Sequence, residues 1–165
     1  GKTTLVNALK ETKQFKDYMF RTERSKFLME QGIPLNTDST LKGQTVFLAE
    51  RCAELIQTDI ITDRTVIDVM AFTMNAKSIP YQDKEAFETY ASEFIREYDH
   101  IFYISPYGLP IEDNGVRETD EHYRDLIDFT ITTLIKRYGH RCQSVEKISG
   151  STDERIQQIL NITGL

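Results

Sequence analysis

The stretch GKTTLVNAL, residues 1–9, decides the predicted fold of this chain. Its start matches the second half of the phosphate-binding pattern G-x-x-x-x-G-K-[ST]. In that loop, main-chain N–H groups and a helix N-terminus surround phosphate, the lysine reaches the terminal phosphates, and the next hydroxyl binds Mg²⁺. The apolar positions that follow suit a helix packed on a sheet. We therefore expect a nucleotide to be bound by Gly1, Lys2, Thr3 and Thr4, with Lys2 also catalytic and Thr3 a metal ligand.

A four-residue match is short, and the alternative is an ordinary amphipathic helix that happens to begin with these letters. The first glycine of the pattern, and the strand that normally leads into it, are not in the numbered sequence. We therefore expect the intact protein to contain residues before Gly1, including a first strand and the start of the phosphate loop.

The bulk composition is that of a soluble globular protein. With 165 residues, 39% hydrophobic and 28% charged, the chain fits a single domain over residues 1–165. Its net charge of −6 argues against broad nonspecific binding of nucleic acids.

Cys52 and Cys142 lie far apart without metal-ligand spacing, which favours buried thiols over a disulfide. No apolar run approaches the roughly 20 residues of a membrane span. We expect a cytoplasmic protein without membrane contact; its oligomeric state is not indicated.

Apolar patterning predicts alternating strands and helices along the chain. Such alternation predicts an α/β fold with three layers, in which helices cover both faces of a mainly parallel sheet. The expected strands are at 15–20, 59–62, 100–106 and 145–148, and the expected helices after the first are at 25–31, 43–56, 65–77, 83–98, 119–138 and 153–160.

The segment 59–64, DIITDR, carries the first candidate site outside the phosphate loop. An Ile-Ile pair before an acidic residue is typical of a buried parallel strand that ends at a site carboxylate. Asp63 could organise Mg²⁺ or accept a proton from a substrate hydroxyl, so it is a candidate catalytic residue and metal ligand. Arg64 could bind a phosphate or a carboxylate of the substrate. The alternative is a helix-capping aspartate beside a surface arginine.

Charged residues also follow the first predicted strand. Arg21, Glu23 and Arg24 lie where ligands bind in an open α/β sheet, at the carboxyl end of a strand. Glu23 and Arg24 are therefore candidate substrate-binding residues. A solvated charged turn is the alternative.

Two later loops complete the predicted site. Residues 107–119 follow the third strand and contain glycines and Arg117, and Thr119 is expected to cap the next helix. An arginine on such a loop suits a lid that closes over the transferring phosphoryl group, so Arg117 is expected to be catalytic and to contact the nucleotide. A plain surface loop is the alternative. Gly150, after the last strand, is a candidate contact of the adenine base.

In this order, the motifs resemble the P-loop nucleoside and nucleotide kinases, an AAA-type group of small ATPases and kinases that includes the ribosylnicotinamide kinase domain of NAD-regulatory proteins. The resemblance covers nearly the whole chain. The segments that carry it are GKTTLVNAL (1–9), YMFRTERSKFLMEQG (18–32), ITDRTVIDVMAF (61–72), HIFYISP (100–106), EDNGVRETDEHYRDLID (112–128) and VEKISGSTDERIQQIL (145–160).

The resemblance implies a three-layer P-loop NTPase fold, with ATP and Mg²⁺ as phosphoryl donor and metal. Lys2 and Thr3 would be at the phosphates and the metal, Asp63 at the metal or the acceptor hydroxyl, and Arg117 on the lid. The implied function is transfer of the γ-phosphoryl group to a small, nucleoside-like acceptor. Two alternatives stay open: a kinase acting on a base hydroxyl or strand end of a nucleic acid, and an ATP-binding switch or interaction module without an acceptor.

Overall fold

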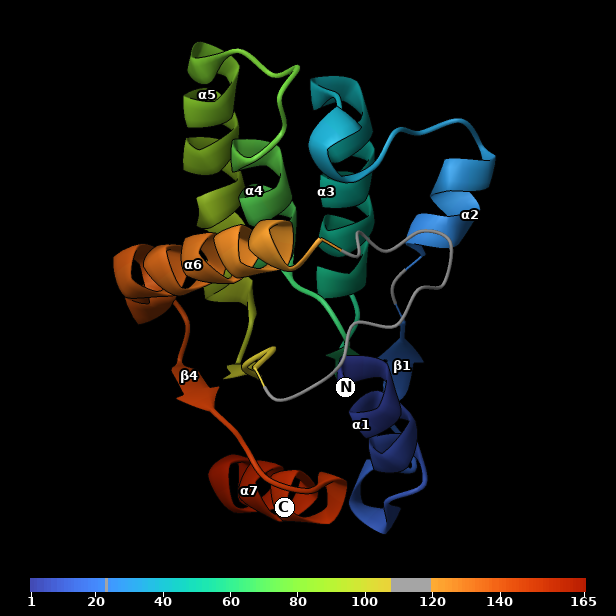
Figure 1. Ribbon diagram of the computed structural model, residues 1–165. Coiled ribbons are helices and arrows are strands. Elements are labelled where there is room, and N and C mark those ends of the chain that lie inside the picture. Colours follow the sequence, from blue (N-terminus) through green and yellow to red (C-terminus); the bar gives the residue numbers. More distant parts are fainter. Residues whose placement is uncertain (23, 108–119) are drawn as a thin grey trace.

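A computed structural model describes residues 1–22, 24–107 and 120–165 (Figure 1). It is an α/β structure with short parallel strands between helices. The α-helices are α1 (Lys2–Lys10), α2 (Ser25–Glu30), α3 (Leu41–Leu55), α4 (Val66–Met74), α5 (Tyr81–Ser92), α6 (Glu121–Tyr138) and α7 (Thr152–Thr163). Short 3₁₀ helices are η1 (Lys13–Phe15), η2 (Asn36–Asp38), η3 (Glu93–Glu97) and η4 (Gly139–Arg141).

The four described strands form two separate parallel pairs. Strand β1 (Met19–Arg21) pairs with β2 (Ile60–Thr62), and β3 (His100–Tyr103) pairs with β4 (Ser144–Lys147). The strands pair in parallel, as expected. The described residues form two separate sheets, however, instead of the expected single sheet. No described strand bridges β2 and β3, so hydrogen bonding stops at the inner edge of each pair.

Helices pack against the strands in two groups, each with its own apolar core. In Figure 1, α3, α4, α5 and α6 lie on one side of the strands, and α1 and α7 on the other. The first core is the larger and includes Val66, Met70, Ala91, Ile95 and Leu134, all completely buried. The second joins Leu5 and Leu9 of α1 to Ile159 and Leu160 of α7, with Phe15 and Ile148 between them. Apolar stripes on the helices thus hold the strands from both sides.

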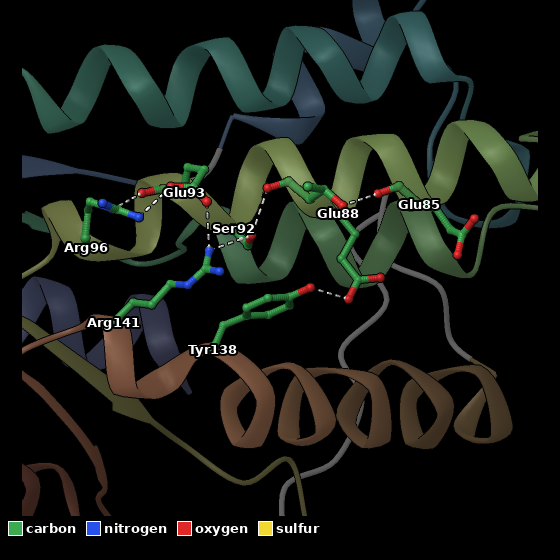
Figure 2. Close-up of polar contacts among 8 residues, drawn as sticks. Glu85, Glu88, Ser92, Glu93, Arg96, Tyr138 and Arg141 are labelled. Carbon is green, nitrogen blue, oxygen red and sulfur yellow. Dashed lines mark hydrogen bonds and ion pairs between the residues drawn. The ribbon is translucent and has the colours of Figure 1, made fainter.

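A polar network fastens α5 and η3 to the end of α6 and to η4 (Figure 2). Glu88 accepts hydrogen bonds from Arg137 and, at 2.8 Å, from the Tyr138 hydroxyl. The Arg141 guanidinium donates to Ser92 Oγ at 2.8 Å and to Glu93 Oε1 at 3.3 Å. These contacts join segments about 50 residues apart in the sequence and tie the end of α6 to α5.

Several element boundaries differ from the sequence prediction. The strand expected at 15–20 begins only at Met19, because residues 13–15 form a 3₁₀ turn that buries Phe15. Helix α3 starts at Leu41 instead of 43, since the Thr40 hydroxyl caps it by accepting from the Gly43 N–H at 3.1 Å. The carboxylate that caps α6 is Asp120, which accepts from the His122 N–H at 2.9 Å; Thr119 lies outside the described residues.

The cysteines are as predicted: both are free, Cys142 buried and Cys52 half-buried. None of the helices in the described ranges combines the length and apolar character needed to span a bilayer.

Candidate nucleotide site

A cavity of about 1200 Å³ lies between the two strand pairs. Its walls include main-chain segments of β2 and β3 together with the start of α1, one face of α3 and part of α6. The polar and charged residues that line it include Lys2, Thr3, Arg24, Arg51, Glu54, Asp63, Arg64 and Asp128. The lining runs along β2 and β3 from the residues before them to the residues after them. Asp63 and Ser105 mark its carboxyl end, which is where an α/β fold binds its ligand.

The start of α1 brings the phosphate-loop residues to this cavity. Gly1 is the N-cap of α1, and its carbonyl accepts the first helical hydrogen bond, from the Leu5 N–H at 3.1 Å. Gly1, Lys2, Thr3 and Thr4 all line the cavity. The N–H groups of a first helical turn have no acceptor within the helix, and the helix dipole favours an anion beside them. This geometry suits a phosphate group.

Thr3 and Asp63 meet although they are 60 residues apart. The Thr3 hydroxyl donates to Asp63 Oδ2 at 3.4 Å. Asp63 directly follows β2 and is 8% exposed, and its N–H donates to the Arg21 carbonyl at the end of β1 at 3.2 Å. Thr65, not Asp63, caps α4, through its hydroxyl and a reciprocal bond to the Asp68 carboxylate. Asp63 is therefore held toward α1 instead of being used to start the next helix.

A hydroxyl and a carboxylate fit the donor set of Mg²⁺. This ion keeps several waters and is bound through one or two carboxylates together with substrate phosphates. No group of three or more metal-binding side chains occurs among residues 1–22, 24–107 and 120–165, so an all-protein cage is not formed there. Thr3 and Asp63 would hold a metal that the phosphates of a nucleotide complete.

The two arginines expected to bind substrate both line the cavity, and each is already held by a carboxylate. Arg24 lies 3.3 Å from Glu50 of α3 and over the ring of Phe27. Arg64 lies 3.6 Å from Asp68 and over the ring of Phe72. These contacts hold both cations in place at the rim of the cavity.

Three predicted site residues are not brought to the cavity by the described structure. Arg117 and Glu23 lie outside the described residues, so their roles remain predictions. Gly150 lines a separate shallow hollow at the start of α7, with Ser149 and Asp153. Its φ of +95°, and a Cβ position 2.4 Å from Glu154 Oε2, explain locally why glycine is there. Its contact with adenine also remains a prediction.

The cavity also contains residues that the sequence analysis did not select. Arg51 and Glu54 of α3 form an ion pair with 2.9 Å between Nη2 and Oε1. The Tyr103 hydroxyl at the end of β3 donates to Asp128 Oδ1 of α6 at 2.6 Å. A signal for the first pair was present, since an arginine and a glutamate three residues apart interrupt the largely apolar face of 47–55.

Comparison with known proteins gives one result. A family model described as an AAA domain matches residues 1–155. No match was found among the curated proteins or among the solved structures. The matched range includes Lys2, Thr3 and Asp63, and also the Arg51–Glu54 pair.

Proposed function

The chain belongs to the AAA domain family and is a P-loop type of nucleotide-binding domain, and on that premise we propose that it is a kinase. It would transfer the γ-phosphoryl group of ATP to a nucleoside-like small molecule. The observation that carries the proposal is the contact between the Thr3 hydroxyl and Asp63 beside the start of α1, at the cavity that both residues line. Positioning and electrostatic stabilisation do most of the work in phosphoryl transfer, and these residues offer both.

Each residue has a specific proposed role. The first turn of α1 binds the phosphates, and Lys2 neutralises charge that builds up on the transferring group. Thr3 and Asp63 would hold Mg²⁺, which when bound would offset the negative charge of the phosphates. Arg24 and Arg64, at the rim, would contact the acceptor. Arg117 on the lid and Glu23 near the acceptor complete the proposal.

We also propose that the complete fold has three layers, with one more parallel strand between β2 and β3. Two facts support it. Each of these strands bonds to only one neighbour within the described residues, and segments 58–62 and 99–106 face the same cavity. A strand there would join the two pairs into one sheet, with Asp63 left at its carboxyl edge beside the ligand.

The test is transfer from labelled ATP to a panel of nucleosides, nucleotides and oligonucleotides, with the intact protein. Transfer to a small acceptor that is lost in Asp63→Ala while ATP still binds would support the proposal. The matched control is Asp17→Ala, which changes an exposed carboxylate outside the cavity. Transfer to oligonucleotides alone would support a nucleic-acid kinase instead. ATP binding without transfer to any acceptor would support a switch or interaction module.

A further inference from the structure

The ion pair between Arg51 and Glu54 is buried in a way that a purely structural role does not explain. The side chains are only 4% and 11% exposed. Removing two charges from water is costly, and a buried pair often contributes little net stability. In the part of the chain that the structure describes, Arg51 forms ion pairs with Glu54 and Glu50 of its own helix. It is Glu50, through Arg24, that links α3 to the segment before α2, so the Arg51–Glu54 pair itself does not fasten α3 to another element.

The pair lies near Asp63. Both residues line the same cavity as Lys2, Thr3 and Asp63, and the Asp63 carboxylate is close enough to act on the charge of Glu54. Glu54 uses Oε1 for Arg51, while its buried Oε2 has no hydrogen-bond partner among the described residues, and neither has Arg51 Nε. A buried oxygen without a donor is costly, which indicates a site that a ligand completes.

The surroundings of Glu54 set its affinity for a proton. Burial raises the pKa of this carboxyl to about 7; Arg51 opposes the rise, whereas Glu50 and Asp63 add to it. The other ionisable groups around it are Arg21, at the end of β1, and Tyr98, which follows η3. A general base must be ionised at the working pH and must also bind a proton well. A carboxylate whose pKa is near neutral meets both requirements.

Asp63 is less suited to this role, because its Oδ2 accepts the Thr3 hydroxyl on the metal side. We propose that Glu54 is the catalytic base that takes the proton of the acceptor hydroxyl, and that Arg51 positions its carboxylate. The inference rests on the proposed kinase function and deepens it by dividing the work between two carboxylates.

The proposed step balances as follows. The acceptor oxygen forms a bond to the γ-phosphorus as the bond from that phosphorus to the β,γ-bridging oxygen breaks, and ADP leaves with the electron pair. The acceptor proton passes to Glu54 Oε2 and then to water. Nothing is oxidised or reduced.

The division of roles also narrows the class of acceptor. An alcohol must lose a proton as it is phosphorylated, whereas the phosphate of a nucleotide is already ionised at neutral pH and needs no base. A built-in base therefore favours a nucleoside hydroxyl over a nucleotide phosphate as the acceptor.

The test compares the wild-type protein with Glu54→Gln and with a matched control, Glu88→Gln. The Glu88 side chain is also 11% exposed and paired with an arginine, but it lies outside the cavity. Transfer from labelled ATP to the nucleoside and nucleotide panel is measured across the neutral pH range, together with thermal unfolding and ATP affinity. In Glu54→Gln we expect kcat for a nucleoside to fall about 100-fold, the acidic limb of the wild-type profile to disappear, and ATP affinity to stay unchanged. Glu88→Gln should keep the wild-type rate and profile.

Two results would overturn the inference. If the wild type phosphorylates an acceptor and Glu54→Gln keeps both its rate and its acidic limb, then Glu54 is not the base, while the kinase proposal stands. If the wild type phosphorylates no acceptor, then the kinase proposal itself fails, and the role of Glu54 fails with it. Thermal unfolding and ATP affinity show whether a loss of rate reflects misfolding.

Discussion

Two glutamate–arginine pairs in this molecule look alike in chemistry and differ in what surrounds them. Glu88 and Glu54 have equally buried side chains, each 11% exposed. Glu88 receives Arg137 and, as Figure 2 shows, Tyr138 from the end of α6. The Arg137 side chain is 52% exposed. Within the described residues, Glu54 pairs with Arg51 of its own helix, and this arginine is almost completely buried.

The difference shows how to separate a structural ion pair from a candidate functional one. The Glu88 pair joins two helices, because its Oε1 accepts from both Arg137 and Tyr138 of α6, so its position is explained by packing. Among the described residues, the Glu54 pair stays within α3, and it leaves a buried oxygen at a cavity. Substitutions on the two sides should therefore change different properties: catalysis at the cavity and stability at the helix interface.

The largest expected effect is on the cavity side, in Lys2→Ala. We expect turnover to fall by a factor of hundreds or more, because one preorganised charge contact to the transferring phosphoryl group is lost. Steady-state transfer from labelled ATP measures it. The control is Lys136→Ala, which removes an exposed lysine from α6. Near-normal activity in the Lys2 variant would refute its assigned role.

The next largest effect is on how stability depends on pH. Glu54 should make the stability of the wild type depend on pH, and the Glu54→Gln variant should lack this dependence. The folded-state pKa of about 7 lies above the ordinary value of 4.5, so the folded state binds more protons between these limits. Protonated Glu54 therefore contributes to the free energy of unfolding. This contribution is fully present below pH 4.5 and is lost as the pH rises through about 7. The wild type and Glu54→Gln should therefore be compared at each pH. The difference between their melting temperatures, wild type minus variant, should fall by a few degrees between pH 4.5 and pH 7. A constant difference would mean that Glu54 titrates normally.

A smaller effect is expected at the helix interface. Glu88→Gln removes the charge that Arg137 pairs with but leaves an oxygen for the Tyr138 hydroxyl. Because Arg137 is half-exposed, the loss should be about 1 kcal/mol, which lowers the melting temperature by about 3 °C in a chain of this size. Denaturant unfolding checks it. If Glu88→Gln lost transfer activity and kept its stability, then the Glu88 and Glu54 ion pairs would not differ in function as proposed.

The smallest effect is expected where both partners are exposed. Arg96 and Glu93 pair within η3 with side chains 57% and 52% exposed. Such pairs contribute little, because solvent screens them and both side chains lose freedom. Arg96→Ala should change the free energy of unfolding by less than about 0.5 kcal/mol. A larger loss would show that the network in Figure 2 acts as a unit that includes Arg96.

The parts of this molecule that sequence predicted well are those that depend on nearby residues. The helices predicted at 25–31 and 119–138 are found at 25–30 and 121–138, and the GKTT start gave the helix that brings Thr3 to the cavity. An acidic residue directly after an Ile-Ile strand pointed to Asp63, and the structure places it beside Thr3.

What sequence did not predict depends on distant segments. Which strand pairs with which depends on the edges that meet in the folded chain, and no local pattern specifies that. Glu54 was overlooked because its environment comes from β1, Asp63 and Tyr98, and only folding brings these around α3. On the helix alone, Arg51 and Glu54 are an ordinary pair three residues apart.

The meeting of Thr3 and Asp63 has a consequence for how the protein responds to its ligands. A nucleotide bound beside them would touch the start of α1 and the residue after β2, which are 60 residues apart in the sequence. Its binding free energy would then add to the cohesion of the whole domain by mass action. The melting temperature, measured in the presence of each candidate ligand in turn, would therefore rank the ligands before any catalytic assay is run.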